Sequence, residues 1–165
     1  MLQLIRSRRS IRKFTGQSVD DEMVEQIIEA GTWAPSGLNN QPWKVAVIRD
    51  PSAKNAIAPL TRYSSIIEDA PVLLALFLDT GASYDRTKDI QAMGAFIQNM
   101  LLAVHALGLG GVWLGEILKN KDKVAWIVSA PDTFELMAVI ALGHPAEKGG
   151  KGSRKGVKEA VFYRG

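Results

Sequence analysis

Residues 89–114 read DIQAMGAFIQNMLLAVHALGLGGVWL and contain the strongest structural pattern in the chain. Its apolar residues follow the longest helical pattern in the sequence, which predicts a helix over residues 89–107. Gly108 follows as the expected C-terminal cap, because glycine adopts a left-handed backbone without strain. Residues 112–114 then predict a short strand, so a long helix leads directly into a sheet.

Apolar patterns on either side of this stretch predict the other elements. Three further strands are expected, two of them continuously apolar and therefore buried, at residues 72–78, 136–142 and, with alternating polarity, 43–48. Four further helices are expected at residues 2–8, 18–31, 52–60 and 119–129. A capping box formed by Ser18 and Asp21 predicts where the second of these begins. The order of strands and helices is typical of a doubly wound parallel sheet, although periodicity leaves the strand direction open.

The composition predicts one globular domain over residues 1–165. The chain has 47% hydrophobic and 22% charged residues, which lies near the average for folded proteins. It has no cysteine, which excludes disulfide scaffolds, thiolate zinc sites and cysteine nucleophiles. The basic N-terminus lacks the apolar region of a signal peptide, and no stretch is long and apolar enough to span a bilayer. We therefore expect a cytoplasmic protein without a membrane partner.

Basic residues gather near the two ends of the chain, although the formal net charge is only +3. Residues 6–13 hold five of the 20 lysines and arginines, and residues 148–158 hold another five. Two such clusters suit an anion, either one phosphate held from both sides or a polynucleotide backbone. A solvated basic surface is the alternative.

The N-terminal cluster contains the motif RRSIRKF, residues 8–14. Arg8, Arg9, Ser10 and Arg12 offer guanidinium groups and a hydroxyl within five residues. Guanidinium groups match the geometry of phosphate with paired hydrogen bonds, which lysine cannot form. The motif therefore favours a phosphate site, with a plain basic arm as the alternative.

The segment WAPSGLNNQPW, residues 33–43, is an amide-rich loop between two tryptophans. Its prolines stiffen the backbone, and Ser36, Asn39, Asn40 and Gln41 can both donate and accept hydrogen bonds. Such a loop could bind the polar edge of a planar heterocycle, or it could be a turn whose side chains satisfy its own backbone.

The glycine run LGLGGVWLG, residues 107–115, lets the backbone approach a flat ligand closely, or simply packs tightly. It does not match a dinucleotide-binding fingerprint, because the third glycine position falls on Trp113. His105 and His144 are isolated, so no metal site, catalytic triad or catalytic acid–base pair is expected.

Four motifs in this order resemble the nitroreductase family of flavin oxidoreductases. They are RRSIRKF, APSGLNNQPW, GAFIQNMLLAVHALGLGGVWLGE, and ALGHPAE followed by the basic KGSRK, and the resemblance covers about residues 4–162. It implies an α+β fold with a mainly antiparallel sheet flanked by helices, instead of a doubly wound sheet. It also implies a homodimer with two FMN molecules at the subunit interface.

The resemblance also implies the positions of the cofactor-binding residues. Around the FMN phosphate it places Arg8, Arg9, Ser10, Arg12, Lys151 and Arg154. Against the flavin rings it places Pro35, Ser36, Gly37 and Asn39 of the partner subunit on one side, and Leu114 and Gly115 on the other. Gly152 stands where family members often carry a lysine, and residues 61–65 hold no match to a common mid-chain flavin contact. The segment between Asp79 and Asp89 is too short for the helical excursion of larger relatives, so we expect an open or small acceptor pocket.

The activity implied by the resemblance is ping-pong transfer of a hydride from NADH or NADPH, through flavin N5, to a nitroaromatic, quinone or similar acceptor. The flavin carries this chemistry, so no catalytic side chain is required. One alternative is a flavoprotein with a specialised reduction, such as dehalogenation. Another is a small basic nucleic-acid-binding domain, which the absence of a recognition motif and of aromatic residues among the basic ones disfavours.

Overall fold

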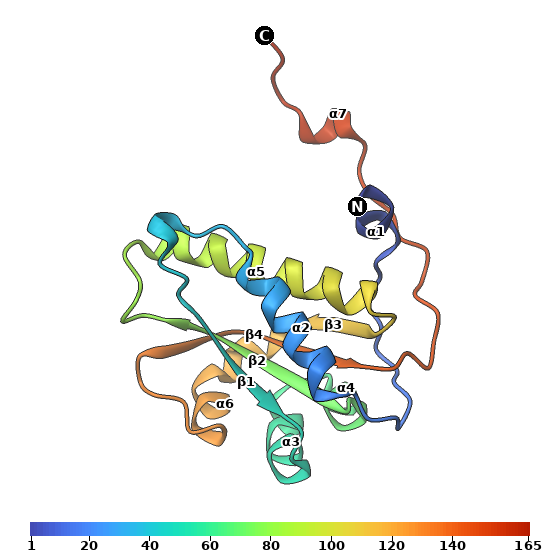
Figure 1. Ribbon diagram of the computed structural model, residues 1–165, viewed down its shortest axis with the longest axis vertical. Helices are drawn as coiled ribbons and strands as arrows, with labels where there is room; N and C mark the ends of the chain where they lie inside the picture. The colour runs from blue at the N-terminus through green and yellow to red at the C-terminus, as the bar shows by residue number, and fades with distance from the viewer.

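The computed structural model describes residues 1–165 and shows one four-stranded sheet with helices on both faces (Figure 1). The strands are β1 (Trp43–Ile48), β2 (Val72–Asp79), β3 (Gly110–Leu114) and β4 (Phe134–Gly143). They lie in the order β1-β2-β4-β3, and every neighbouring pair is antiparallel. The antiparallel α+β fold is thus confirmed, and the doubly wound parallel sheet is wrong. A strand that is buried on both faces has a continuous apolar run in a parallel and in an antiparallel sheet, so the hydrophobic pattern could not give the strand direction.

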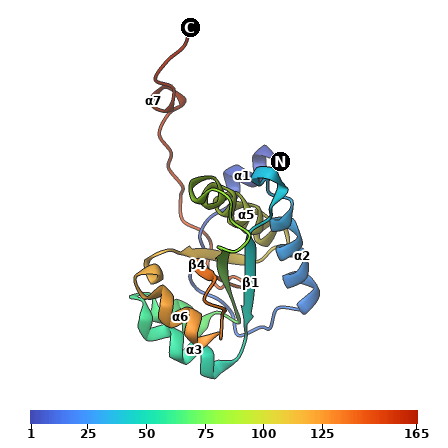
Figure 2. The same ribbon diagram turned by 90° about the vertical axis from the view of Figure 1, so that its left-hand side faces the viewer.

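Two groups of helices cover the two faces of the sheet (Figure 2). One face packs against α2 (Asp21–Thr32) and the long α5 (Arg86–Ala106), and α1 (Leu2–Ser7) packs on α5. The other face packs against α3 (Pro51–Ile57), α4 (Ser64–Asp69) and α6 (Lys121–Ile127). Three 3-10 helices complete the body, at Gly37–Asn39, Ala58–Leu60 and Glu116–Asn120. Both cores therefore share one sheet.

Successive side chains of β2 point to opposite faces of the sheet, so this strand contributes residues to both cores. Leu74 and Leu76 face α2 and α5, whereas Leu73 and Phe77 face the second group of helices, and all four are fully or almost fully buried. Gly31 lets α2 approach α5 closely, since a Cβ atom there would lie 2.7 Å from the ring of Phe96.

The boundaries of the helices confirm some predictions and correct others. α5 is followed by Gly108 with φ +76°, as predicted. α2 begins at Asp21 after Asp20, with no side-chain cap, so the capping box at Ser18 is wrong. The predicted helix over residues 119–129 divides into a 3-10 turn and α6. The short α4 was not predicted, because six residues are too few to show a helical period.

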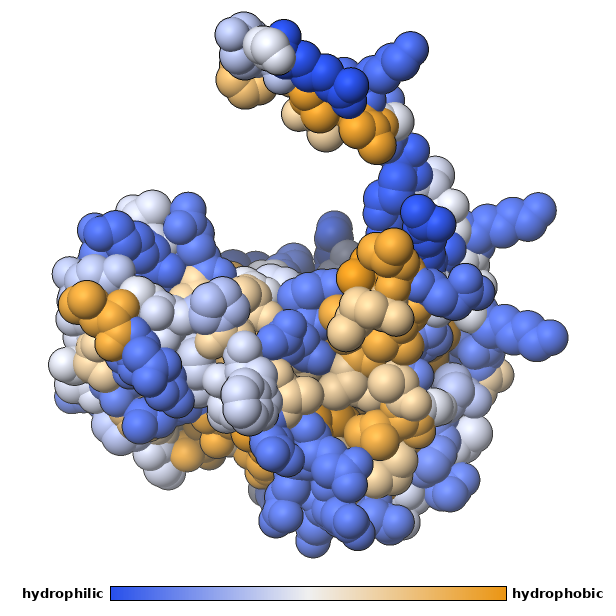
Figure 3. Space-filling view, turned by 45° about the horizontal axis from the view of Figure 1, so that its top comes forward, coloured by the Kyte–Doolittle hydropathy of each residue, from blue (hydrophilic) through white to orange (hydrophobic).

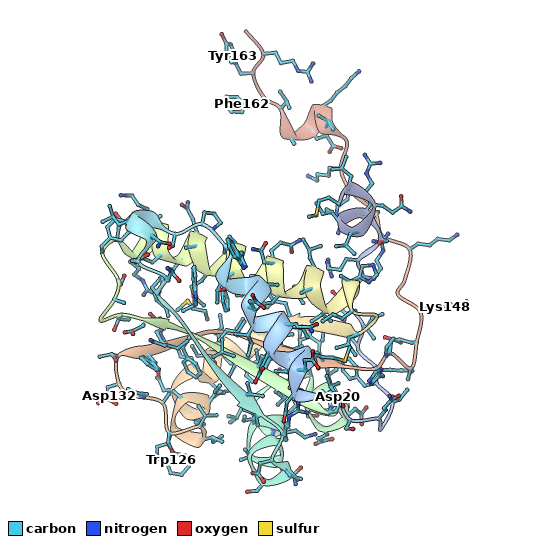
Figure 4. The ribbon with its side chains drawn as sticks, in the orientation of Figure 1. Asp20, Trp126, Asp132, Lys148, Phe162 and Tyr163 are labelled. Atoms are coloured by element: carbon cyan, nitrogen blue, oxygen red, sulfur yellow. The ribbon has the colours of Figure 1, made fainter.

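The C-terminal arm, residues 156–165, leaves the body and carries α7 (Val157–Ala160) (Figure 1). All of its residues are exposed, and Figure 4 shows Phe162 and Tyr163 beyond α7, away from the body. None of the helices in the chain combines the length and the apolar character that a bilayer crossing requires.

Candidate functional site

The N-terminal motif runs beside the segment that follows β4, so the two basic ends of the chain meet. Ile11 N–H donates to the carbonyl of Gly111 at 3.1 Å, and Thr15 N–H donates to that of His144 at 2.8 Å. Lys13 accepts from Ala146 N–H at 3.0 Å. These backbone bonds hold residues 10–15 against the edge of β3 and the end of β4.

Arg9 joins the two basic segments directly. Its Nε donates to the carbonyl of Gly150 at 3.0 Å, and its Nη1 donates to the carbonyls of Arg6 and Arg8 at 2.7 Å. A Cβ atom on Gly152 would lie 2.6 Å from Cζ of Arg9, so a larger residue there would displace the end of the Arg9 side chain. Two nitrogens of Arg9 are thus bound to backbone, and Nη2 remains for a ligand.

The basic side chains of this region form no salt bridges, although the backbone N–H of Arg12 donates to the carboxylate of Glu147 at 3.0 Å. None of the basic residues in 6–13 and 148–158 forms a salt bridge, although six lysines and arginines elsewhere do. Partial burial lowers the pKa of Arg8, and the positive charges of Arg154 and Arg9 lower it further. Arg154 is exposed and donates only to the carbonyl of Ser153, and Lys151 is also exposed. The cluster therefore carries positive charge that an external anion can neutralise.

A cavity of about 580 Å³ opens beside the cluster. Its lining residues come from the N-terminal motif, from α4 and from the segment after β4: Ser10, Arg12, Lys13, Ser65, Ile66, Asp69, Glu147, Lys148 and Gly150. The volume suits a small ligand. Figure 4 shows Lys148 projecting outward from the segment after β4. The contribution of α4 was missed because that helix was not predicted.

The edge of β3 connects this cavity to the predicted residues Leu114 and Gly115. Ser10 pairs with Gly111 on that edge, and Leu114 lies about 10 Å further along the strand. Leu114 is buried in the core, so only its backbone can meet a ligand, whereas Gly115 is exposed. The structure thus brings the predicted phosphate-binding motif and the predicted ring contacts to one sheet edge.

Glu116 fixes the end of this edge to the segment before α4. Its carboxylate accepts from Thr61 Oγ1 at 2.6 Å and from Arg62 N–H at 3.2 Å, and it forms a salt bridge with Lys119. Hydrogen bonds from Lys119 and Thr61 hold its pKa at about 2. No sequence motif pointed to this contact, because its two sides are far apart in the chain.

The predicted loop of Pro35, Ser36, Gly37 and Asn39 lies elsewhere. It packs on the first half of α5, where its first three residues line a separate cavity of about 320 Å³ with Tyr84, Lys88 and Gln91. At the other end of the helix, Ser7 contacts His105 at 2.8 Å, beside Arg8. Gln91 and His105 are about 21 Å apart along the helix axis. One chain therefore holds the two halves of the predicted site at opposite ends of α5 (Figure 1).

Comparisons with known proteins show which family this sequence and fold match. The model of the nitroreductase family matches residues 5–62 and 59–144. A Methanothermobacter thermautotrophicus protein, assigned as an NADH dehydrogenase/NAD(P)H nitroreductase, is 34% identical over 91% of this chain and 80% of its own length. An NADH dehydrogenase of Thermus thermophilus is 30% identical over 95% of this chain and 92% of its own length. Among solved structures, a protein of Desulfovibrio desulfuricans, assigned as a nitroreductase and solved in complex with FMN, is 47% identical, with a TM-score of 0.94 over 99% of this chain and 96% of that one.

Proposed function

Because this chain belongs to the nitroreductase family, we propose that it is an FMN-dependent oxidoreductase that uses NADH or NADPH. The observation that carries the proposal is the unpaired basic cluster where the two ends of the chain meet, beside a cavity of about 580 Å³. The FMN complex of the similar Desulfovibrio desulfuricans protein supports the identity of the ligand.

The donors of this site fit the phosphate of FMN. Arg8, Arg12 and Arg154 supply guanidinium groups, Ser10 supplies a hydroxyl, and no carboxylate forms a salt bridge with these arginines. Arginine binds phosphate oxygens in pairs, and the hydroxyl can donate to a further oxygen. Lys151, on the same exposed segment, adds positive charge.

The flavin rings would lie along the open edge of β3. Beyond the Ser10–Gly111 bridge, no backbone bond from a neighbouring segment covers this edge as far as Leu114, so its N–H groups can donate to ring heteroatoms. Gly115 has no side chain to block the approach of a flat ring. When bound, FMN supplies the redox chemistry, accepting a hydride from a reduced nicotinamide and passing the electrons to an acceptor.

The chain itself binds and orients the cofactor, and needs no catalytic acid or base. Positive charge in this region favours the anionic reduced state of a flavin. Only Thr80–Asp85 connects β2 to α5, without a helix, and this connection lies beside the Pro35–Gly37 loop, so little of the chain extends over the flavin of the partner subunit. We infer an open pocket in which the nicotinamide and then a nitroaromatic, quinone or similar acceptor bind in turn.

We also propose that the protein is a homodimer. The two halves of the predicted site lie at opposite ends of α5, so a second chain is needed to bring the Pro35–Asn39 loop to the flavin. An apolar surface on the α5 side supports this: a hollow lined by Met1, Leu4, Trp33, Leu102 and other mostly apolar residues, with Trp33 81% exposed. Figure 3 shows apolar residues on this side of the body and along the underside of the C-terminal arm. Such a surface is typical of an interface.

Steady-state kinetics test the proposed reaction. With NADH or NADPH varied at several concentrations of a quinone or nitroaromatic acceptor, we expect parallel double-reciprocal lines, as ping-pong turnover requires. Intersecting lines would contradict the shared pocket, and activity with a halogenated aromatic alone would favour the specialised reduction. Sedimentation velocity tests the dimer: a monomer that retains FMN would contradict it.

A further inference from the structure

A buried carboxylate in the first turn of α5 connects two loops of the candidate site. Asp89 is 0% exposed and is the only charged side chain buried in the chain. Its oxygens accept from Asn40 Nδ2 at 2.8 Å and Ser83 Oγ at 2.6 Å, and from the backbone N–H groups of Tyr84 at 3.0 Å and Asp85 at 3.2 Å. Burial alone would raise the pKa of Asp89, but these hydrogen bonds outweigh it and lower the pKa. An ionised carboxylate therefore sits at this position at neutral pH.

The donors come from two separate segments, and both line the same cavity. Asn40 belongs to the amide-rich loop, and Tyr84 to the Thr80–Asp85 connection. Asn40 Nδ2 also donates to the carbonyl of Ala82 at 3.1 Å, so this one amide binds the connection twice. The cavity of about 320 Å³ lies between the two segments, with Ser36 on one wall and Tyr84 on the other.

The amide-rich loop has a strained backbone that needs such a support. Leu38, Asn39 and Gln41 have φ values of 55°, 54° and 47°, in the left-handed region that residues other than glycine rarely adopt. The side-chain hydrogen bonds inside the loop, from Gln41 to Ser36 and Asn39, stay within it and cannot fix it to the body. The side chain of Asn40 makes that connection, and its own Oδ1 is buried without a donor.

We propose that Asp89 is a positioning residue that, through Asn40, holds the Pro35–Gln41 loop in the conformation that meets the flavin of the partner subunit. This inference rests on the function proposed above. Asp89 touches neither flavin nor substrate. It acts by fixing Ser36 and Asn39 before the ligand binds, and by setting the width of the cleft between the loop and Tyr84.

Two substitutions remove the connection in different ways. Asp89→Asn keeps the shape of the side chain but leaves one acceptor oxygen for four donors. Asn40→Ala is milder, because Asp89 keeps three of its four hydrogen bonds. Arg86→Ala is the matched control: it removes a salt bridge to Glu135 at the start of the same helix and touches neither loop.

The readouts are the rate of flavin reduction by NAD(P)H per bound FMN, the visible circular dichroism of the bound flavin, and Tm. We expect both loop variants to lower the rate about tenfold or more and to change the dichroism, since misplaced binding groups lose rate steeply. The control should lower Tm while its rate per bound FMN stays within about twofold of the wild type.

Three outcomes determine whether the positioning role of Asp89 and the proposed function stand. Variants that lose Tm but keep the wild-type rate and dichroism would overturn the positioning role and leave the proposed function intact. A wild-type protein that binds no FMN, or binds it without reduction, would overturn the proposed function and this inference with it. If Asp89→Asn does not fold, Asn40→Ala alone decides by the same criteria.

Discussion

Replacing Arg8 by glutamine separates cofactor binding from the stability of the flavin-free protein. Arg8 is partly buried next to Arg9 and Arg154, and their positive charges, together with burial, lower its pKa. Its charge is therefore unfavourable in the flavin-free chain and favourable once a phosphate dianion is bound. The same substitution should move the two quantities in opposite directions.

The expected sizes follow from the contacts. Loss of a charge-assisted hydrogen bond to phosphate costs about 1.5–3 kcal/mol, which weakens FMN binding roughly 10- to 150-fold. Removal of repulsion within a partly solvated cluster stabilises the flavin-free protein by at most about 1 kcal/mol. For a chain of this size, Tm should therefore stay constant or rise by roughly 2–4 °C.

Titration of the flavin-free protein with FMN and with riboflavin isolates the phosphate contribution. Arg8→Gln should weaken FMN binding and leave riboflavin binding unchanged, because riboflavin lacks the phosphate. Arg49→Gln is the control, since Arg49 pairs with Asp21 at 2.8 Å on the surface away from the cluster. Equal loss for both flavins, or no loss for FMN, would refute the phosphate role. A fall of several degrees in the Tm of the flavin-free variant would refute the repulsion.

Three further predictions concern packing, acid stability and assembly. Gly31→Ala should lower Tm by roughly 2–4 °C, because the clash with Phe96 at 2.7 Å costs about 2 kcal/mol and the gain in helix propensity is about 1 kcal/mol, which leaves a net loss of about 1 kcal/mol. An unchanged Tm would contradict the close packing. Hydrogen bonds from an arginine and a lysine lower the pKa of Glu135 to about 2 from its ordinary 4.5, so its stabilisation is complete above pH 4.5 and lost as pH falls towards 2. Urea unfolding of Glu135→Gln over this range should show a smaller loss of stability than the wild type, and parallel curves would exclude the effect. Deletion of residues 157–165 removes the exposed Phe162 and Tyr163 and should weaken the proposed dimer, as measured by sedimentation velocity. The Tm of the monomer should not fall. An unchanged dimer dissociation constant would show that the arm is not part of the interface.

The elements that bury most apolar surface could be predicted from the sequence. β2 and β4 are continuous apolar runs, and α5 has a long helical period, so their places in the chain follow from hydrophobicity alone. Strand direction could not follow from the same pattern, because both faces of these strands are buried. The antiparallel sheet was predicted only through the resemblance to the nitroreductase family.

The sequence could predict the part of the candidate site whose chemistry follows from residue type alone. The arginines at both ends of the chain predicted an anion site, and the structure brings Arg154 close enough to Arg8 for its positive charge to lower the pKa of Arg8. The contacts of Asp89 and Glu116 were missed, because an acidic residue in the first turn of a helix is usually interpreted as a surface charge. Their partners are distant in sequence, so only the fold shows the contacts.

The visible absorption spectrum of the purified protein, recorded before and after anaerobic addition of NADH or NADPH, shows whether the protein binds a flavin that reduced nicotinamide can reduce. We predict a flavin spectrum that bleaches when the reduced nicotinamide is added. A flavin spectrum that persists would contradict NAD(P)H as the electron donor. Absence of flavin absorbance, even after incubation with FMN, would contradict the assignment of the basic cluster to the phosphate of this cofactor.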